Sequence, residues 1–247
     1  MSDHCKHCRA ALEGTPTRRQ LMTGAAAVLA ASALSVGRAK AGADTIVTPQ
    51  NVIPPPEALD RLMKGNARYA ANTPNERDFS HDRAERATAQ YPIAAVLSCA
   101  DSRVSPELLF DQGPGDVFVV RLAGNFLDDD GFASLEYAVK FLGAPLVMIL
   151  GHTNCGAIDA AIKVVKERIE LPGHLSELIK SIEPAVIAAH ARHPSDLLAA
   201  ATEENVRLNM KRLVDNEPIM TEPLAEKKLA IAGGVYDIAT GKVNLLT

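Results

Sequence analysis

The sequence predicts an α/β fold: a central, mainly parallel β-sheet flanked by helices, with an N-terminal helical arm. Short continuous apolar runs alternate with longer stretches of helical periodicity, as in parallel sheets whose strands are buried on both faces. The chain has 247 residues, which is room for one ordinary α/β domain or two small ones. Its composition, 47% hydrophobic and 23% charged, excludes collagen, low-complexity disorder and a multi-span membrane protein.

Residues 1–43 differ from the rest and have the features of an export signal. Arg18 and Arg19 precede an Ala-rich apolar run of about 16 residues, 21–36, and small residues at cleavage-type spacing follow up to Ala43. The paired arginines indicate a twin-arginine signal, and the run is shorter than the roughly 20 residues that span a bilayer. We therefore expect export to the periplasm and no stable membrane anchor after cleavage. The alternative is a buried Ala-rich helix.

Loss of this leader changes the charge and the cysteine content of the protein. The full chain has a net charge of −4, and residues 1–43 hold six basic and two acidic residues, so the rest has a net charge of −8. We expect no nucleic-acid partner for such an acidic protein. Only Cys99 and Cys155 of the four cysteines remain, which excludes a disulfide-dense scaffold.

The first elements predicted after the leader are a linker and a helix. Residues 44–56 end in three prolines, which remove amide donors and disfavour a helix. From 57 to 71, apolar side chains recur at intervals of three and four, which predicts an amphipathic helix with one buried stripe. Residues 72–90 are polar and predict a loop with a short helix around 83–89. One domain is expected over 57–247.

Short apolar runs predict the strands of the sheet, and the stretches between them predict its helices. The strands are expected at residues 93–97, 117–120, 146–150 and 229–236, with a hairpin return at 242–245. The helices are expected at 134–142, 157–168, 175–191 and 195–215. This alternation favours a parallel sheet with helices on both faces.

Two groups of polar residues come directly after predicted strands. Cys99, Asp101 and Arg103 follow the run 93–97, and His152 and Cys155 follow the run 146–150. Because reactive groups gather beyond the carboxyl ends of parallel strands, we expect both groups at one edge of the sheet.

Two thiols and one imidazole at one edge form a candidate zinc site. Zinc takes Cys and His ligands, and three protein ligands leave a fourth position for a water molecule whose pKa the metal lowers. Asp101 and Arg103 share one face of extended backbone, so Arg103 can hold Asp101 ionised by two charge-assisted hydrogen bonds. Asp101 can then accept the proton of that water; without Arg103, its carboxylate could take the fourth zinc position.

Each of these residues also has a plain structural interpretation. Cys99 and Cys155 are compatible with buried thiols or with a disulfide, and His152 with a hydrogen-bonded core histidine. Asp101 and Arg103 are compatible with a structural ion pair. The combination favours chemistry, because all five residues follow strands.

At these residues the sequence resembles a β-class carbonic anhydrase. The motifs that carry the resemblance are Cys99-Ala100-Asp101-Ser102-Arg103-Val104 and His152-Thr153-Asn154-Cys155-Gly156, and the similarity extends over roughly residues 57–247. The resemblance implies zinc held by Cys99, His152 and Cys155, and a catalytic dyad of Asp101 and Arg103. It implies reversible hydration of carbon dioxide to bicarbonate and a proton by zinc-bound hydroxide. Between His152 and Cys155, Thr-Asn stands where smaller residues are commoner.

The resemblance also implies a substrate pocket. Gln90 stands nine residues before Cys99, where a subgroup of the family carries a glutamine, and Phe118 and Tyr137 stand where aromatic side chains are expected. That subgroup has an accessible zinc. Gln90 is expected to donate to the substrate oxygen, and Val104, Phe118 and Tyr137 to form a dry slot.

The family builds dimers, so the resemblance implies a homodimer or homotetramer. The helix near 57–71 is then expected to pack on the partner subunit; the alternative is packing within its own subunit. Three other functions stay open: a carbon disulfide or carbonyl sulfide hydrolase on the same scaffold, a non-catalytic zinc protein, and a redox protein with a Cys99–Cys155 disulfide.

Overall fold

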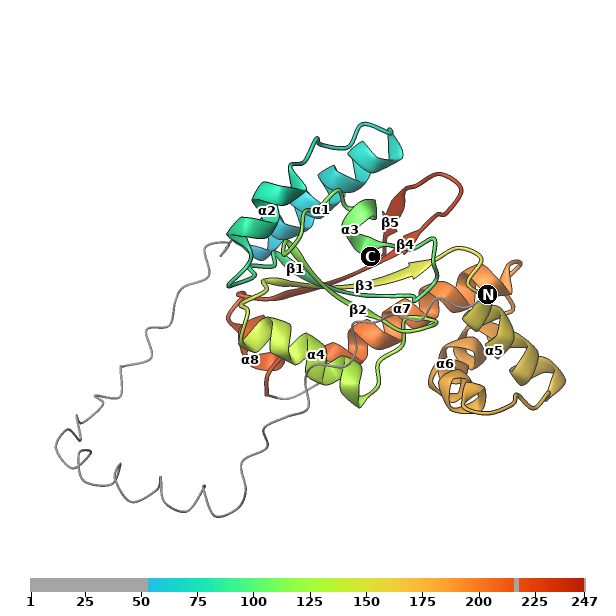
Figure 1. The fold of residues 1–247 in the computed structure, drawn as a ribbon. Helices are drawn as coiled ribbons and strands as arrows, with labels where there is room; N and C mark the ends of the chain where they lie inside the picture. The colour runs from blue at the N-terminus through green and yellow to red at the C-terminus, as the bar shows by residue number, and fades with distance from the viewer. Residues whose placement is uncertain (1–52, 216–217, 247) are drawn as a thin grey trace, which may run out of the picture. The chain divides into compact units, whose positions relative to one another are not determined.

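A five-stranded sheet with the strand order β2-β1-β3-β4-β5 forms the centre of the structure (Figure 1). The computed structural model describes residues 53–215 and 218–246, so the predicted leader and residues 44–52 of the predicted linker lie outside the described residues. Pro55 and Pro56, predicted as the end of that linker, instead form the start of the first helix, where proline is tolerated. The first four strands run parallel, and the last pairs antiparallel with β4. The strands are β1 (Ala94–Ser98), β2 (Val117–Arg121), β3 (Leu146–His152), β4 (Ala230–Tyr236) and β5 (Val243–Leu245). The predicted fold class is confirmed.

Helices cover both faces of this sheet (Figure 1). One face carries α1 (Pro55–Ala70), α2 (Phe79–Glu85) and α3 (Pro106–Leu109); the other carries α4 (Asp129–Lys140), α7 (Leu197–Val214) and α8 (Thr221–Ala225). Two further helices, α5 (Gly156–Glu167) and α6 (Leu175–His190), follow the carboxyl end of β3. None of the helices in the described ranges is long and apolar enough to cross a membrane.

The structure differs from the predicted elements mainly where side chains cap helices. Helix α4 begins at Asp129, five residues before the predicted start at 134, because the Asp128 side chain accepts a hydrogen bond from the Gly131 amide at 2.7 Å. Asp78 accepts hydrogen bonds from two backbone amides at the start of α2, which is why that helix lies at 79–85 rather than 83–89. Helices α3 and α8 have four and five residues, too few to show a helical period in the sequence.

The apolar stripe of α1 packs on the sheet of its own chain. Ala58 and Leu62 are fully buried in a core cluster with Val96, Phe110 and Met148. The buried stripe of the helix therefore packs within its own chain.

Asn66 ties α1 to two segments that are distant in sequence. Its side chain is almost fully buried; its Nδ2 donates to the carbonyls of Leu109 (3.1 Å) and Gly241 (2.9 Å), and its Oδ1 accepts from the Val243 amide (2.8 Å). Buried polar groups are costly when they lose their partners, so this one amide fixes α1 against α3 and the β4–β5 hairpin.

Replacement of Asn66 by alanine is expected to lower the free energy of unfolding by about 2 kcal/mol or more, because three buried backbone groups lose their partner. Urea denaturation of the two proteins measures the difference. Lys64→Ala, on the exposed face of the same helix, removes only the solvent-exposed ion pair with Asp60 and is expected to change stability by less than about 0.5 kcal/mol. Equal stabilities for Asn66→Ala and Lys64→Ala would contradict this role.

Candidate metal centre

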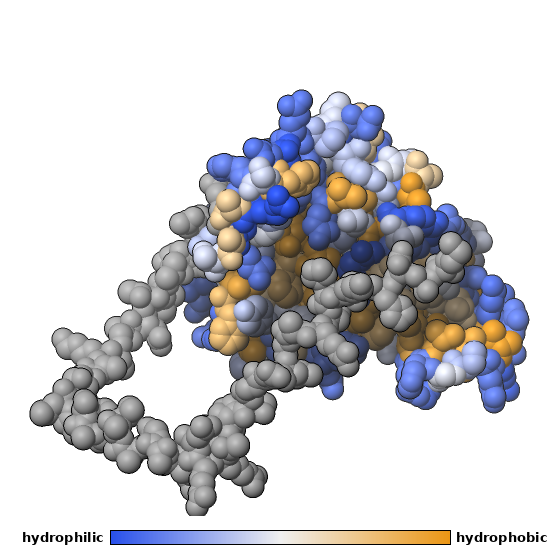
Figure 2. All heavy atoms as spheres, in the orientation of Figure 1, coloured by the Kyte–Doolittle hydropathy of each residue, from blue (hydrophilic) through white to orange (hydrophobic). Residues whose placement is uncertain are grey.

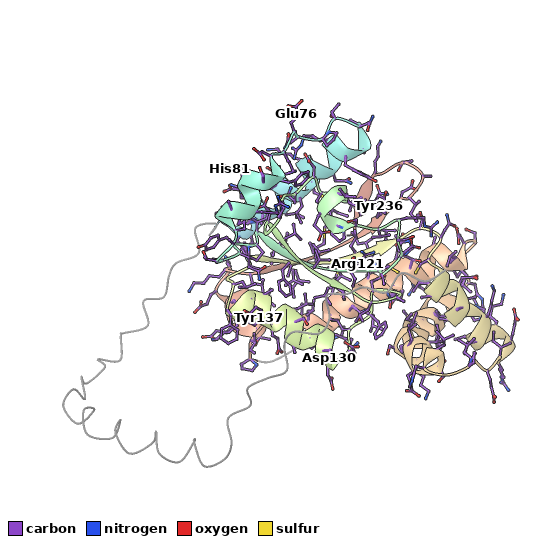
Figure 3. The ribbon with its side chains drawn as sticks, viewed as in Figure 1. Glu76, His81, Arg121, Asp130, Tyr137 and Tyr236 are labelled. Atoms are coloured by element: carbon purple, nitrogen blue, oxygen red, sulfur yellow. The ribbon has the colours of Figure 1, made fainter. Side chains whose placement is uncertain are left out.

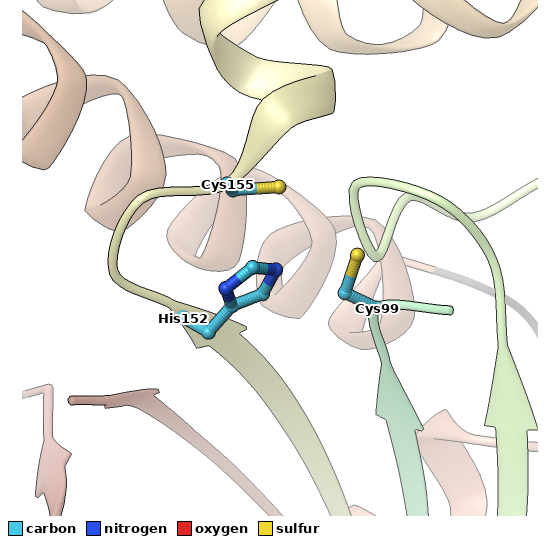
Figure 4. Close-up of side chains that lie close together, drawn as sticks. All are labelled: Cys99, His152 and Cys155. Atoms are coloured by element: carbon cyan, nitrogen blue, oxygen red, sulfur yellow. The ribbon is translucent and has the colours of Figure 1, made fainter. Parts of the chain in front are cut away.

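The pairing of β1 with β3 brings the candidate ligands together. Ser98 lies opposite Leu150 in parallel register, so Cys99 leaves β1 at the edge where His152 ends β3. Cys155 follows at the N-cap of α5. The Sγ atoms of both cysteines and a ring nitrogen of His152 all lie within 4.8 Å of one another (Figure 4). The expected convergence at one edge of the sheet is confirmed.

All three side chains are buried, and the backbone carbonyl of Thr153 fixes the orientation of the His152 ring. The exposed fractions of Cys99, His152 and Cys155 are 4%, 0% and 1%. Nδ1 of His152 lies 2.9 Å from the Thr153 carbonyl, so it donates its proton there and leaves Nε2 as the free nitrogen. In the described part of the chain, this buried Nε2 has no hydrogen-bond partner. An unpartnered imidazole nitrogen beside two thiols fits a metal ion such as zinc, which takes this donor set.

The surroundings of the two sulfurs favour a thiolate. Cys99 and Cys155 are free cysteines whose sulfurs lie within 4.8 Å of each other. The interaction with Cys155 lowers the pKa of Cys99 although burial acts against it, and the backbone amides of Gly124 (3.2 Å) and Asp101 (3.4 Å) donate to its sulfur. The interaction with Cys99, together with burial, raises the pKa of Cys155. Burial disfavours a charged His152, but the adjacent Cys99 thiolate raises the pKa of that imidazole.

Asp101 is clamped by Arg103 at the mouth of the centre. Nε and Nη2 of Arg103 donate to the two carboxylate oxygens at 2.9 and 2.7 Å, and the Arg103 backbone amide donates to Oδ1 at 2.9 Å. These bonds keep the pKa of the Asp101 carboxyl far below its ordinary value, so it stays ionised at neutral pH. Its Oδ2 lies 4.0 Å from Nε2 of His152, which puts a fixed negative charge next to the three candidate ligands.

Arg121 supports this loop from the end of β2, a role that the sequence did not reveal. Its guanidinium donates to the carbonyls of Cys99 (3.2 Å) and Asp101 (2.6 Å), and Figure 3 shows it at the centre of the molecule, near the ends of the strands. An arginine at the end of an apolar strand was the available signal. Nothing in the spacing, however, indicates that its partners are backbone carbonyls of the neighbouring loop.

The residues expected to line the substrate pocket do not gather at this edge. Val104 does lie beside the dyad: it is fully buried and its amide donates to the Asp101 carbonyl at 3.0 Å. Gln90, in contrast, is exposed and precedes β1, whereas Cys99 follows it. Five residues of extended strand separate the two ends by about 16 Å.

Two aromatic residues of the expected pocket lie together, but on the outer side of the sheet. The rings of Phe118 and Tyr137 are 6.3 Å apart, and Phe141 continues the row at 5.4 Å from Tyr137. Phe118 pairs with Ala95 near the amino end of β1, and Tyr137 lies on α4, away from Arg121 in Figure 3. Tyr137 and Phe141 are 48% and 73% exposed, so this aromatic row faces outward from its own chain.

Comparison with known proteins gives one family. A family profile described as "Carbonic anhydrase" matches residues 94–243. Carbonic anhydrase 2 of Mycobacterium tuberculosis is 35% identical over 192 residues, which cover 77% of this chain and 92% of that protein. The carbonic anhydrase of Pseudomonas aeruginosa is 35% identical over 169 residues, covering 65% of this chain and 76% of that one.

Solved structures share the fold. The β-carbonic anhydrase CcaA superposes with a TM-score of 0.61 at 26% identity, covering 76% of this chain and 95% of that chain. A β-carbonic anhydrase of Coccomyxa gives a TM-score of 0.56 at 29% identity, covering 76% and 86%. A tetrameric β-carbonic anhydrase of Sordaria macrospora has the same fold, with a TM-score of 0.61 at 24% identity over 77% and 97% of the two chains. The chain therefore belongs to the carbonic anhydrase family, in its β class.

Proposed function

We propose that this protein catalyses the zinc-dependent, reversible hydration of carbon dioxide to bicarbonate and a proton. One observation carries the proposal: two buried sulfurs and a free imidazole nitrogen lie within 4.8 Å of one another, with a clamped carboxylate 4.0 Å from that nitrogen. The relatives named carbonic anhydrases support the same assignment.

Cys99, His152 and Cys155 would hold the zinc ion. When bound, zinc supplies the Lewis acidity that makes a water molecule nucleophilic near neutral pH. Two thiolates neutralise much of the metal charge, so a nearby group has to help to orient the nucleophile and take its proton. Asp101 is suited to this task, because Arg103 keeps its carboxylate ionised and fixes its direction.

The clamp on Asp101 also argues against a purely structural zinc protein. Three hydrogen bonds from Arg103 engage its two oxygens and keep the carboxylate from swinging freely as a fourth metal ligand. Hydrolysis of carbon disulfide or carbonyl sulfide would use the same groups. Assays with each substrate therefore have to distinguish this reaction from the hydration of carbon dioxide.

The direct test is stopped-flow hydration of carbon dioxide, followed with a pH indicator near pH 8.5, on protein whose zinc content has been measured. Rapid hydration with about one zinc ion per chain is expected. Zinc-replete protein without hydration would contradict the proposal, and activity on carbonyl sulfide alone would replace it.

Two substitutions are expected to separate metal binding from turnover. Cys155→Ser should lose both zinc and activity, because it removes one of three protein ligands. Asp101→Asn should keep its zinc and lose turnover by about 100-fold or more, because it removes the ionised acceptor. Zinc content is measured by metal analysis and turnover by the hydration assay.

A matched control for Asp101→Asn is Asp129→Asn, which makes the same chemical change at an exposed site in the first turn of α4. It should leave zinc content and turnover unchanged. Full activity in zinc-replete Asp101→Asn would remove the dyad from the mechanism.

We further propose that Gln90, Phe118 and Tyr137 act on the metal centre of a second subunit in a homodimer or homotetramer. Within one chain they lie toward the amino end of the strands, whereas the metal centre lies at the carboxyl end. Strand β2 is at the edge of the sheet, and the aromatic row beside it is exposed. Figure 2 shows hydrophobic residues between the helices above the sheet and α4 below it. Unpaired strand edges with apolar surroundings favour association with another chain.

Mixing two variants that are each expected to be impaired tests this arrangement. Cys155→Ser keeps Gln90 but lacks a metal ligand, and Gln90→Ala keeps the metal centre but lacks the amide donor. Co-refolded in equal amounts, they should recover about a quarter of the wild-type sites, because half of the random dimers are mixed and each has one complete site. Activity no greater than the mean of the two separate variants would contradict action across subunits.

Export to the periplasm is our proposal for residues 1–43, and the Arg18-Arg19 pair before the apolar run supports it. Because the twin-arginine route carries folded proteins, the thiolates would receive their metal in the reducing cytoplasm. A reporter fused to residues 1–43 should reach the periplasm. When both arginines are replaced by lysine, the fusion should stay in the cytoplasm. A wild-type fusion that stays in the cytoplasm would contradict export.

A further inference from the structure

The backbone amide of Gly124 contacts a candidate metal ligand directly. It donates to Sγ of Cys99 at 3.2 Å, in a buried position. Gly124 belongs to the loop between β2 and α4, which has little regular structure of its own. A hydrogen bond from such a loop has a defined length only if something else holds the loop.

Helix α7 holds this loop through three side chains on one face. Nδ2 of Asn205 donates to the Gly124 carbonyl at 2.8 Å, and Oδ1 of Asn209 accepts from the Leu127 amide at 3.0 Å. Nη1 of Arg212 donates to the Leu127 carbonyl at 2.6 Å. The spacing of four and then three residues places all three side chains along one side of the helix.

The two asparagines form a linked, fully buried pair. Their exposed fractions are 0% for Asn205 and 1% for Asn209. Nδ2 of Asn209 also donates to the Asn205 carbonyl at 2.8 Å, which fixes its amide plane. Burial of an amide is costly unless it is hydrogen-bonded, so each asparagine has a strong preference for this one arrangement.

Gly124 is thereby held at both of its backbone polar groups: the amide by Cys99 and the carbonyl by Asn205. Its φ of +85° is open to glycine and strained for other residues. A Cβ at this position would lie 2.5 Å from Cδ1 of Ile182 and 3.1 Å from Cβ of Ala157. Gly124 is therefore closely packed against Ile182 and Ala157. The hydrogen bond from Asn205 to the Gly124 carbonyl sets how the peptide groups on either side of Gly124 are oriented, including its amide.

We propose that Asn205 is a positioning residue for the metal centre: through Gly124 it sets the hydrogen bond to the Cys99 sulfur and so the electron donation of that thiolate to the metal. The inference rests on the proposed function, since it requires a metal at this centre. Hydrogen bonds to a ligating sulfur withdraw electron density from it, and groups outside the ligand set tune metal affinity in this way.

The test is the spectrum of the cobalt(II)-substituted protein, comparing wild type with Asn205→Ala. The sulfur-to-cobalt charge-transfer band should move to longer wavelength in the variant, because a sulfur without the amide hydrogen bond is more electron-rich. Zinc affinity, measured by competition with a chromophoric chelator, should fall about 10-fold or more, because the ligand is less well positioned.

Thr202→Val is the matched control. Thr202 lies on the same helix, is nearly fully buried, and its hydroxyl donates to the Leu198 carbonyl of the same helix at 2.8 Å. Valine keeps the shape and removes one buried hydrogen bond, so stability should fall while the cobalt spectrum and the zinc affinity stay as in wild type. A similar fall in stability in Asn205→Ala, without a spectral change, would show a merely structural role.

Arg212→Gln provides a second variant, which matters if Asn205→Ala does not fold. It removes the Leu127 contact and leaves Asn205 in place, so a smaller band shift in the same direction is expected. Spectra of the folded variants identical to wild type would overturn the inference and leave the proposed function standing. Wild-type protein that binds no cobalt through sulfur would overturn the proposed function and the inference together.

Discussion

The parallel pairing of β1 with β3 is the constraint on which the metal centre depends. Its register places Ser98 opposite Leu150, so Cys99 and His152 leave their strands at the same edge. Since successive side chains of a strand alternate between faces, a slip of one residue would turn one ligand away from the other. The register is fixed by side chains on both faces: Val96 and Met148 pack on the α1 side, and Leu97 and Ile149 on the side of α4 and α7.

Apart from Nε2 of His152, which is left without a hydrogen-bond partner, the buried polar atoms of the ligand residues have partners from several segments. The Thr153 carbonyl fixes the imidazole, and the amides of Gly124 and Asp101 face the Cys99 sulfur. These donors come from loops that are themselves held by charged and amide side chains, namely Arg121 and the asparagines of α7. The chemistry of the centre therefore depends on groups far from it in sequence.

The sheet also divides the candidate functional residues into two sets. The three candidate ligands and the Asp101–Arg103 dyad lie at the carboxyl ends of the parallel strands, because the loops that leave these strands converge there. Gln90 comes from the segment before β1, Phe118 from the beginning of β2 and Tyr137 from α4 beside Phe118, so they lie away from the metal centre of their own chain. In the assembly of subunits that we propose, both sets would serve one site.

The sequence by itself determined the strands, the main helices and the convergence of Cys99, His152 and Cys155, because continuous apolar runs mark buried parallel strands and fix where each one ends. It also indicated the Asp101–Arg103 clamp, but for a reason that the structure corrects. Residues 102 and 103 form a turn rather than extended backbone, and in this turn the Arg103 amide donates to Oδ1 of Asp101 and the Val104 amide donates to the Asp101 carbonyl. The sequence did not reveal the early start of α4, which depends on a cap by Asp128, nor the roles of Arg121 and Asn205. Those roles were decided by tertiary structure, because each consists of hydrogen bonds between a side chain and backbone groups 20 to 81 positions away in the chain. Backbone groups are the same in every residue, so no pattern of side chains marks them.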